Sequence, residues 1–319
     1  MKAIVRYTYG SLALEEVDKP TIKDDEVLVR VRAASVNPYD WHHLTGTPYI
    51  MRIGAGLRKP KETAMGVDVA GVVEAVGPDV TGFQPGDEVF GMRSGAFAEY
   101  MGVREVRIAL KPAGLTFEQA AAVPLAALTA LQALRDKGKI QAGQQVLING
   151  ASGGVGTFAV QLAKVFGTKV TAVCSTRNVD TARSLGADRV IDYTREDFVQ
   201  SGQVYDLILD VAGNRSIADR KRALAPNGIL VLVGGPKKGR WLGPLTSALM
   251  LVLASKIGSK KLMPMLTQLV NEDLVALRKL LETGQLKPVV ERTYPLHEVP
   301  QALRYVGEGH SQGKIVISV

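Results

Sequence analysis

The segment 145–156 begins as an apolar strand and continues as a glycine-rich turn, and an amphipathic run follows it. The segment Gln145–Asn149 predicts a buried strand, and four glycines follow it between Gly150 and Gly156. Because glycine has no Cβ, backbone N–H groups there can approach an oxyanion, and the next helix directs its positive dipole end to the same charge. The sequence therefore predicts a site for the phosphates of a dinucleotide.

The segments after this turn favour the same interpretation. Apolar runs at 169–174, 189–192, 206–211 and 228–233 are nearly continuous, and 157–166 is amphipathic. Continuous apolar runs are typical of parallel strands that are buried on both faces. We expect a nucleotide-binding Rossmann unit; a doubly wound domain without a dinucleotide is the alternative.

The end of the second strand of this unit indicates which dinucleotide binds. Enzymes that prefer NAD usually place Asp or Glu there to accept hydrogen bonds from the ribose 2′-hydroxyl. Here the residues are Cys174-Ser175-Thr176-Arg177-Asn178, with no acid. Hydroxyl groups and a guanidinium suit a 2′-phosphate, so we predict NADPH, with Ser175 and Arg177 as its ligands. A solvated Arg177 on the surface is the alternative.

Length and composition favour two domains. A chain of 319 residues with 46% hydrophobic content can bury one large core or two ordinary ones, and the glycine turn near its middle favours two. Strand-like pieces such as Lys2–Arg6 and Glu26–Arg32 fill the first half. The last segment, 313–319, also reads as a strand, and we expect it to return to the first domain.

Charge and cysteine content restrict the compartment and the partners. A single cysteine excludes a disulfide framework and a thiolate zinc site within the chain. The net charge is +8, but aromatic residues do not interleave with the basic clusters, so we expect no nucleic acid partner. The chain opens on a strand without a targeting segment, so we expect it in the cytoplasm.

The segment 241–265 is unusually apolar. Its most apolar part runs from Trp241 to Ile257, and Gly243 and Pro244 interrupt this part early and leave fewer than the ~20 residues that a membrane-spanning helix needs. We interpret the segment as a lid over a substrate pocket or as a subunit interface. A helix lying on a membrane surface and ordinary core are the alternatives.

Several motifs, taken in order, resemble the medium-chain dehydrogenase/reductase superfamily over the whole chain. They are Val36-Asn37-Pro38-Tyr39-Asp40-Trp41, Gly66-Val67-Asp68-Val69-Ala70-Gly71, Gly82-Phe83-Gln84-Pro85-Gly86-Asp87, Gly95-Ala96-Phe97-Ala98-Glu99-Tyr100, Pro124 to Leu134, and Ala151 to Gly156. Within this superfamily the chain is most similar to the zinc-free quinone oxidoreductase branch. The resemblance implies an α/β protein with a GroES-like, mostly-β catalytic domain and a doubly wound Rossmann domain.

From this resemblance we predict a catalytic domain at 1–124, completed by 285–319, and a Rossmann domain at 125–284 that binds NADPH. The resemblance also implies a homodimer, although no pattern in the sequence encodes its interface.

The chain departs from the zinc-dependent alcohol dehydrogenases of the same superfamily. Those enzymes place a cysteine ligand where Asn37 stands and a histidine ligand where Val67 stands. Neither a carboxamide nor a valine replaces a thiolate and an imidazole, and His42 and His43, being adjacent in sequence, point in different directions. We therefore predict no metal site.

Without zinc, an electrophilic acceptor is a more suitable substrate than an alcohol. A quinone or an α,β-unsaturated carbonyl needs an oriented hydride donor, hydrogen-bond donors and a proton. By the resemblance, Asn37 lies beside the nicotinamide and donates to the substrate oxygen or to the cofactor carboxamide; its other role would be to cap the turn before Pro38. Tyr39, Tyr49 and Trp41 are further donors, and Asp40 could relay a proton.

The resemblance implies further cofactor contacts. It places Thr129 near the diphosphate or the nicotinamide ribose, Tyr193 on the nucleotide side, and three residues at the ends of later strands. The complete set is Asn37, Thr129, Ser152, Gly153, Gly154, Val155, Ser175, Arg177, Tyr193, Val211, Gly234 and Gly235.

We therefore expect a zinc-independent, NADPH-dependent reductase that transfers hydride to quinones or to the C=C bond of enones and alkenals. A second class remains open at this stage. A protein with this NADPH site could act as a redox-sensing binding or scaffold protein with weak or no catalysis. The sequence does not identify the physiological acceptor or the proton donor.

Overall fold

The structure, a computed structural model, describes residues 1–234, 255, 259–309 and 311–319. The chain divides into two compact units. The first unit contains Met1–Leu128 and Leu269–Val319, and the second contains Thr129–Gln268.

The predicted borders were 124/125 and 284/285, so the two divisions differ chiefly over residues 269–284. Helix α9 (Asn271–Glu282) packs on strand β7 (Ile108–Leu110), and Asn271 donates to the carbonyl groups of Val106 and Ile108, which ties this segment to the first unit.

The described strands of the second unit form one six-stranded parallel sheet in the order β10-β9-β8-β11-β12-β13. Their bounds are β8 (Gln145–Asn149), β9 (Lys169–Cys174), β10 (Arg189–Asp192), β11 (Tyr205–Asp210), β12 (Leu224–Leu232) and β13 (Lys261–Pro264). The first three match the predicted ranges. The strand order reverses beside β8, which is where open parallel sheets bind ligands, at the carboxyl ends of the strands.

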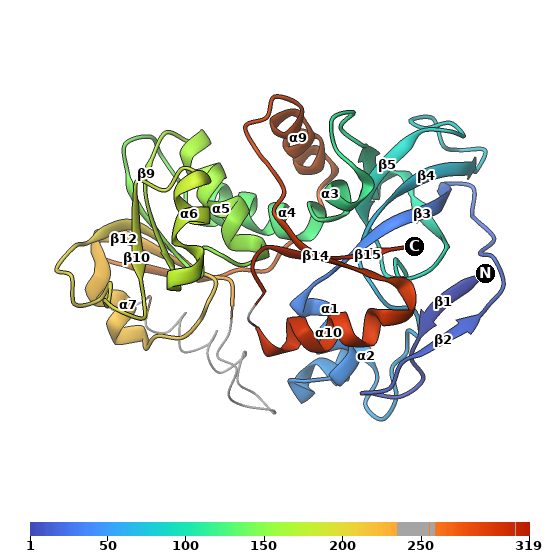
Figure 1. Ribbon diagram of the computed structural model, residues 1–319, viewed down its shortest axis with the longest axis horizontal. Helices are drawn as coiled ribbons and strands as arrows, with labels where there is room; N and C mark the ends of the chain where they lie inside the picture. The colour runs from blue at the N-terminus through green and yellow to red at the C-terminus, as the bar shows by residue number, and fades with distance from the viewer. Residues whose placement is uncertain (235–254, 256–258, 310) are drawn as a thin grey trace. The chain divides into compact units, whose positions relative to one another are not determined.

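Helices cover this sheet in the way that buried parallel strands require. Helices α5 (Gly154–Val165) and α6 (Val179–Ser184) lie side by side and pack on β8, β9 and β10, whereas α7 (Ile217–Ala223) packs on β12 (Figure 1). The core between these layers includes Leu147, Val173, Ile208 and Leu230. These residues come from the apolar runs that predicted the strands.

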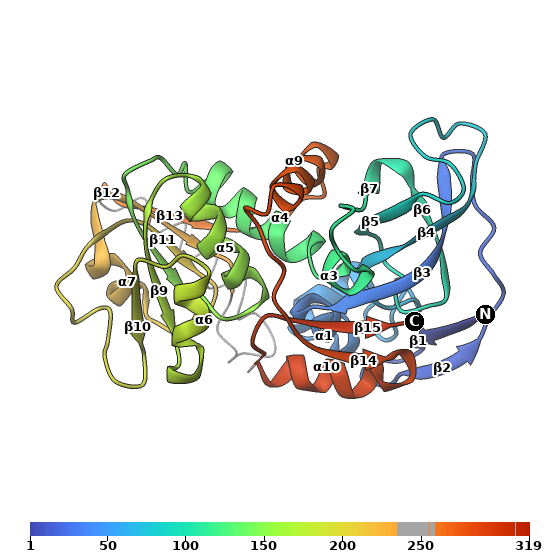
Figure 2. The same ribbon diagram turned by 45° about the horizontal axis from the view of Figure 1, so that its top comes forward.

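The first unit is built around β3 (Glu26–Val36), which pairs with three other strands. The sheet order is β14-β15-β3-β4-β5-β7, with β6 also paired to β3, and β1 and β2 form a separate ribbon. The remaining bounds are β1 (Lys2–Val5), β2 (Ala13–Glu16), β4 (Asp68–Val76), β5 (Glu88–Met92), β6 (Tyr100–Arg104), β14 (Val290–Pro295) and β15 (Lys314–Ser318). The last strand of the chain, β15, pairs antiparallel with β3 (Figure 2).

Helices pack around the sheet of the first unit. They are α1 (Pro38–Thr45), α2 (Arg52–Ala55), α3 (Phe117–Ala121), α9 and α10 (Val299–Glu308), and α4 (Pro124–Gln132) begins in this unit. The helices α1 and α10 contact each other, and the apolar face of α10, with Val299 and Leu303, enters the core. No helix in the described ranges is long and apolar enough to cross a membrane.

Candidate functional site

In the first unit, three strands bring polar residues together at one end of the sheet. The antiparallel register of β3 and β4 places Ser35 opposite Asp68, and that of β15 and β3 places Ile315 opposite Val36. The end of β3 therefore lies between the first residue of β4 and the first residue of β15. The chain then turns at Asn37 into α1.

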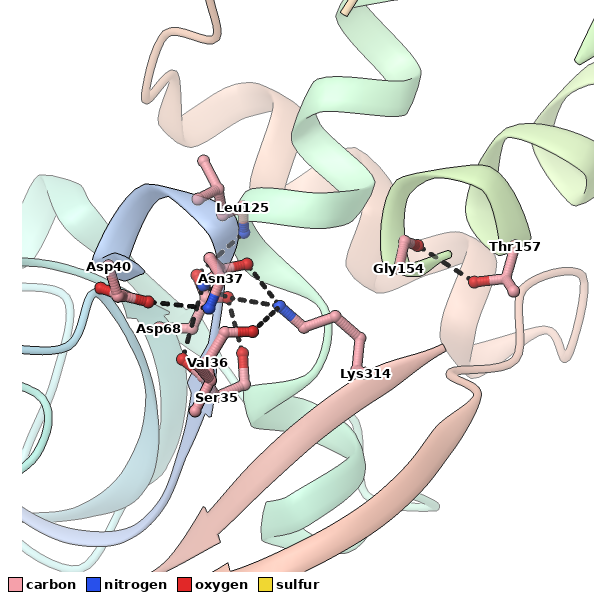
Figure 3. Close-up of polar contacts among 9 residues, drawn as sticks. All are labelled: Ser35, Val36, Asn37, Asp40, Asp68, Leu125, Gly154, Thr157 and Lys314. Atoms are coloured by element: carbon pink, nitrogen blue, oxygen red, sulfur yellow. Dashed lines mark hydrogen bonds and ion pairs between the residues drawn. The ribbon is translucent and has the colours of Figure 1, made fainter. Parts of the chain in front are cut away.

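Asp68 is the centre of a buried hydrogen-bond network (Figure 3). Its Oδ2 accepts from Ser35 Oγ at 2.8 Å, from Asn37 Nδ2 at 2.9 Å and from Lys314 Nζ at 3.3 Å. Its Oδ1 accepts from the backbone N–H of Leu125 at 2.9 Å, in the first turn of α4. A buried carboxylate needs such partners, because removing it from water costs several kcal/mol.

Lys314 supplies the positive charge in this network. Its side chain is 3% exposed, and its ammonium donates to Asn37 Oδ1, to Asp68 and to the carbonyl of Val36 at 3.4 Å. All three N–H groups of the ammonium thus have acceptors. Lysine is rarely buried unless it is paired, so the pairing with Asp68 is what allows a charged residue at the start of an apolar strand.

Asn37 stands at the N-cap position of α1, and Pro38 follows at N1. The carboxylate of Asp40, at N3, accepts from the Asn37 backbone N–H at 2.8 Å. Burial, together with the nearby Asp68 charge, raises the pKa of Asp40 to about 7, although the Asn37 N–H and Lys314 act in the opposite direction. The predicted relay residue is therefore a buried acid that titrates near neutrality.

The two predicted tyrosines lie in different settings. The Tyr39 side chain is 45% exposed and its ring centroid is 3.9 Å from that of His43; burial raises the pKa of its phenol. Tyr49 lies in the turn after α1, where the Arg52 guanidinium sits 4.6 Å from its ring centroid. The same guanidinium donates to the carbonyl group of Gly46 at 2.9 Å and so fixes this turn.

In the second unit, the glycine turn follows β8 as predicted. Gly150 has φ +87°, and Gly153 caps α5. A Cβ on Gly156 would lie 2.1 Å from the Gly150 carbonyl oxygen, so only glycine fits there. Ser152, Gly153, Gly154 and Val155 are partly exposed at the start of a twelve-residue helix, and Thr157 Oγ1 donates to the Gly154 carbonyl at 3.0 Å (Figure 3). This cradle and its N–H donors fit a diphosphate.

The turn after β9 carries the residues predicted to bind a 2′-phosphate. Arg177 is exposed, and Ser175 Oγ accepts from Asn178 Nδ2 at 3.0 Å. An acid from the next strand also reaches this turn, because Asp192 accepts from Thr176 Oγ1 at 2.6 Å. That hydroxyl lowers the pKa of Asp192, which also accepts from Thr194. Tyr193 is 54% exposed beside it.

The ends of β8 and β11 are joined by a second buried network. Asp210 accepts from Asn149 Nδ2 at 2.8 Å and from Arg220 Nε at 2.6 Å. Val211 follows directly, and Gly234 approaches it so closely that a Cβ there would lie 2.0 Å from the Val211 carbonyl oxygen. Gly235 and most of the apolar segment 241–265 lie outside the described residues.

Thr129 lies on α4, is 5% exposed, and has its hydroxyl oxygen 2.7 Å from that of Thr267. It is therefore held inside the second unit. Within the described ranges, no group of three or more His, Cys, Asp and Glu side chains is arranged to hold a metal ion.

The structure thus joins Asn37 and Asp40 in one network, and it places Tyr39 beside them and Tyr49 in a separate, Arg52-braced turn. Sequence reasoning missed Asp68, Lys314 and Ser35 as members of this site. The available signal was a charged residue at the first position of each of two apolar strands, at Asp68 and at Lys314.

Comparison with known proteins supports the architecture of both units. Residues 23–113 match the family described as alcohol dehydrogenase GroES-like domain, and residues 185–317 match the family described as zinc-binding dehydrogenase. The quinone oxidoreductase of Coxiella burnetii has a similar structure, with a TM-score of 0.88 and 31% identity over 100% of this chain and 99% of that one. These matches confirm the predicted fold class, a GroES-like domain with a doubly wound Rossmann domain.

Two plant enzymes are similar in sequence along almost the whole chain. The 2-methylene-furan-3-one reductase of Solanum lycopersicum is 35% identical over 99% of this chain and 79% of its own length. The NADPH-dependent alkenal/one oxidoreductase of Arabidopsis thaliana chloroplasts is 34% identical over 99% of this chain and 79% of its own.

Proposed function

This chain belongs to the medium-chain dehydrogenase/reductase superfamily and is an oxidoreductase, and we propose that it is a zinc-independent, NADPH-dependent reductase of quinones or of α,β-unsaturated carbonyls. Two observations, each within one unit, carry the proposal: the second unit has a dinucleotide-type glycine turn, and the buried network of the first unit holds a carboxamide, Asn37. When bound, the nicotinamide supplies the hydride.

The choice of NADPH over NADH rests on the charges near the end of β9. Arg177 is exposed there, and Asp192, the acid that reaches this turn from β10, already accepts from Thr176 and Thr194. A carboxylate that already accepts several hydrogen bonds is a weaker acceptor for a ribose hydroxyl, whereas a guanidinium suits a phosphate.

Independence from zinc rests on side-chain chemistry. Asn37 and Val67, which stand where zinc-dependent relatives carry a thiolate and an imidazole, are 3% and 8% exposed. Both N–H groups of the Asn37 amide are directed to acceptors, at Asp68 and at the Ser35 carbonyl. A valine offers no lone pair at all, so the pair cannot serve as metal ligands.

An acceptor that is already electrophilic fits such a site, because it does not need a metal to polarise it. The relatives named for quinones and for alkenals support this class of substrate. The chain's own residues would orient the acceptor through the exposed face of Tyr39 and through Tyr49, and Asp40 would hold a proton near neutral pH.

The test is acceptor-dependent oxidation of NADPH by the full chain in chelator-treated buffer, with a benzoquinone, a 2-alkenal, or no acceptor, and each repeated with NADH. We expect oxidation that depends on an acceptor, that survives chelation and that is faster with NADPH. Oxidation that stops on chelation and returns with zinc would refute zinc independence. Tight NADPH binding without turnover of any acceptor would favour a binding or sensing protein instead.

A further inference from the structure

Arg52 joins the turn that carries Tyr49 to the last turn of α1. Its Nε donates to the carbonyl group of Gly46 at 2.9 Å, and its Nη2 donates to that of Thr45 at 3.1 Å. Thr45 is the last residue of α1, and Gly46 is its C-cap. Because the final carbonyl groups of a helix lack partners within the helix and form its negative dipole end, a guanidinium is a favourable partner for them.

The same guanidinium also lies against two aromatic rings. Its central carbon is 4.1 Å from the ring centroid of Tyr9 and 4.6 Å from that of Tyr49. The N–H donors of a guanidinium lie in its plane, so its faces stay available to aromatic rings while the donors bind carbonyl groups. Such contacts are attractive because the ring faces are electron-rich. Arg52 therefore holds the Tyr49 ring and the end of α1 at once.

Tyr9, which supports Arg52, is itself held by the surrounding backbone. Its hydroxyl donates to the carbonyl group of Gly56, the C-cap of α2, at 2.5 Å. A Cβ on Gly46 would lie 2.5 Å from Cδ1 of the Tyr9 ring, so the ring packs directly against the C-cap of α1. The ring thus links the ends of both helices, and Arg52 packs on it.

The turn that carries Tyr49 has little packing of its own to hold it. Neither the 3₁₀ helix Tyr49–Met51 nor α2 (Arg52–Ala55) contains a buried residue. Helices as short as these are not stable in isolation, and segments with few buried contacts open at a low cost in free energy. We therefore expect the place of Tyr49 to depend on Arg52 and not on a hydrophobic core.

We propose that Arg52 is a positioning residue for the electron acceptor: it holds Tyr49 in one place relative to α1, the helix that carries Tyr39, so that the two tyrosines meet an acceptor without rearrangement. When the competent arrangement is populated only part of the time, the apparent affinity for a ligand falls by that fraction. The inference rests on the proposed function, in which Tyr39 and Tyr49 orient the acceptor. It concerns the first unit alone, so the affinity for the dinucleotide is expected not to change.

Calorimetric titration of the NADP⁺-loaded full chain measures acceptor binding without turnover, because the oxidised cofactor has no hydride to transfer. The probes are a tetramethyl benzoquinone and a cyclic enone, and the one that the wild type binds more tightly is used throughout. Arg52→Met should raise the dissociation constant of this acceptor about tenfold, which corresponds to a competent arrangement populated about a tenth of the time. The dissociation constant of NADP⁺ should stay the same.

A double-mutant cycle tests whether Arg52 acts through Tyr49. Tyr49→Ala should weaken acceptor binding by itself, and adding Arg52→Met to Tyr49→Ala should change the dissociation constant little further. Two residues that acted separately would instead multiply the effects of the two substitutions, and that result would overturn the proposal.

Arg93→Met is the matched control. Arg93 is likewise a partly buried arginine of the first unit; it pairs with Glu26 at 3.0 Å and donates to the Gly102 carbonyl group. This variant should lose stability in urea but bind the acceptor as the wild type does. If urea unfolding shows that Arg52→Met is not folded, Tyr9→Leu, which removes the ring that supports Arg52, replaces it and should also raise the dissociation constant about tenfold.

An unchanged dissociation constant in folded Arg52→Met, or in Tyr9→Leu where that variant replaces it, would overturn the inference. An equal rise in Arg93→Met, or a wild type that binds neither acceptor, would overturn it too. Failure of the proposed function has a different signature, which is the absence of acceptor-dependent NADPH oxidation. A wild type that oxidises NADPH, with an Arg52→Met variant that binds the acceptor equally well, would retain the reductase and lose the positioning role of Arg52.

Discussion

Two carboxylates and one ammonium share the buried end of β3, so the charges there cannot all be balanced at once. Lys314 neutralises Asp68, whereas Asp40 accepts from the backbone N–H of Asn37 in the capping box of α1. This arrangement explains why burial raises the pKa of Asp40 to about 7. A proton on Asp40 is the simplest way for the site to become neutral.

The raised pKa makes stability depend on pH in a defined direction. In the unfolded chain Asp40 loses its proton near pH 3.8, and in the folded chain near pH 7, so its contribution is fully present below the lower value and is lost as pH rises through the higher one. Asp40→Asn should therefore be more stable relative to the wild type at about pH 9 than at about pH 5. Urea unfolding at both pH values checks this.

Asp24→Asn, which changes an exposed aspartate of the same unit, is the control and should show no such difference. A constant offset between Asp40→Asn and the wild type across this range would contradict the raised pKa.

The exposed guanidinium of Arg177 is the group that we expect to distinguish NADPH from NADH. Replacing it by glutamate puts a like charge against the 2′-phosphate, so Arg177→Glu should raise the KM for NADPH by about tenfold or more and change that for NADH little. Arg183→Glu, on the nearby exposed face of α6, is the matched variant and should leave both constants almost unchanged. Equal effects of Arg177→Glu on the two cofactors would remove this residue from the 2′-phosphate site.

At the scale of elements, the second unit was readily predicted because its strands are continuous apolar runs with glycine punctuation. The ranges of β8, β9 and β10 match the sequence-based ones, and β11 begins one residue earlier than expected. The strands of the first unit and their pairing were harder to predict. Its strands are short, uneven and paired with distant segments, and local patterns do not encode such pairing.

The site in the first unit shows the same limit. Asn37 and Asp40 were found because they are close in sequence, but Asp68 and Lys314 join them only through the registers of β4 and β15 on β3. No local pattern reports that residue 314 lies beside residue 37. The donor role expected for Asn37 likewise could not be checked before its partners were known.

In the glycine turn, we expect one alanine substitution to lower stability and another to lower the affinity for NADPH. Gly156→Ala would force a Cβ to 2.1 Å from the Gly150 carbonyl oxygen, so it should lower the free energy of unfolding by about 3 kcal/mol. A Cβ on Gly153 meets nothing closer than 3.9 Å, so Gly153→Ala should fold normally but bind NADPH more weakly, because the Cβ enters the space of the diphosphate.

Urea unfolding and NADPH titration separate the two effects. Normal NADPH affinity in Gly153→Ala would show that this turn does not approach the phosphates.

Over the whole molecule, the net charge of +8 would attract a polyanionic ligand such as NADPH. Raising the salt from about 0.01 M to about 0.1 M shortens the Debye length from about 30 Å to about 10 Å. The dissociation constant for NADPH should therefore rise several-fold over this range, and that for NADH, which lacks the 2′-phosphate, should rise less. Equal and flat salt dependence for the two cofactors would argue against electrostatic recognition of the 2′-phosphate.

Zinc-independent hydride transfer is tested most directly by stopped-flow kinetics of metal-free protein. The protein oxidises NADPH that carries deuterium at the transferred position, with a 2-alkenal and with a benzoquinone as acceptors. Zinc-independent hydride transfer predicts slower oxidation of the labelled cofactor with the acceptor that is used and, for the alkenal, deuterium on a carbon of the saturated product. An oxidation rate that is insensitive to the label for both acceptors, with no deuterium in the product, or a rate that appears only when zinc is added, would contradict the account.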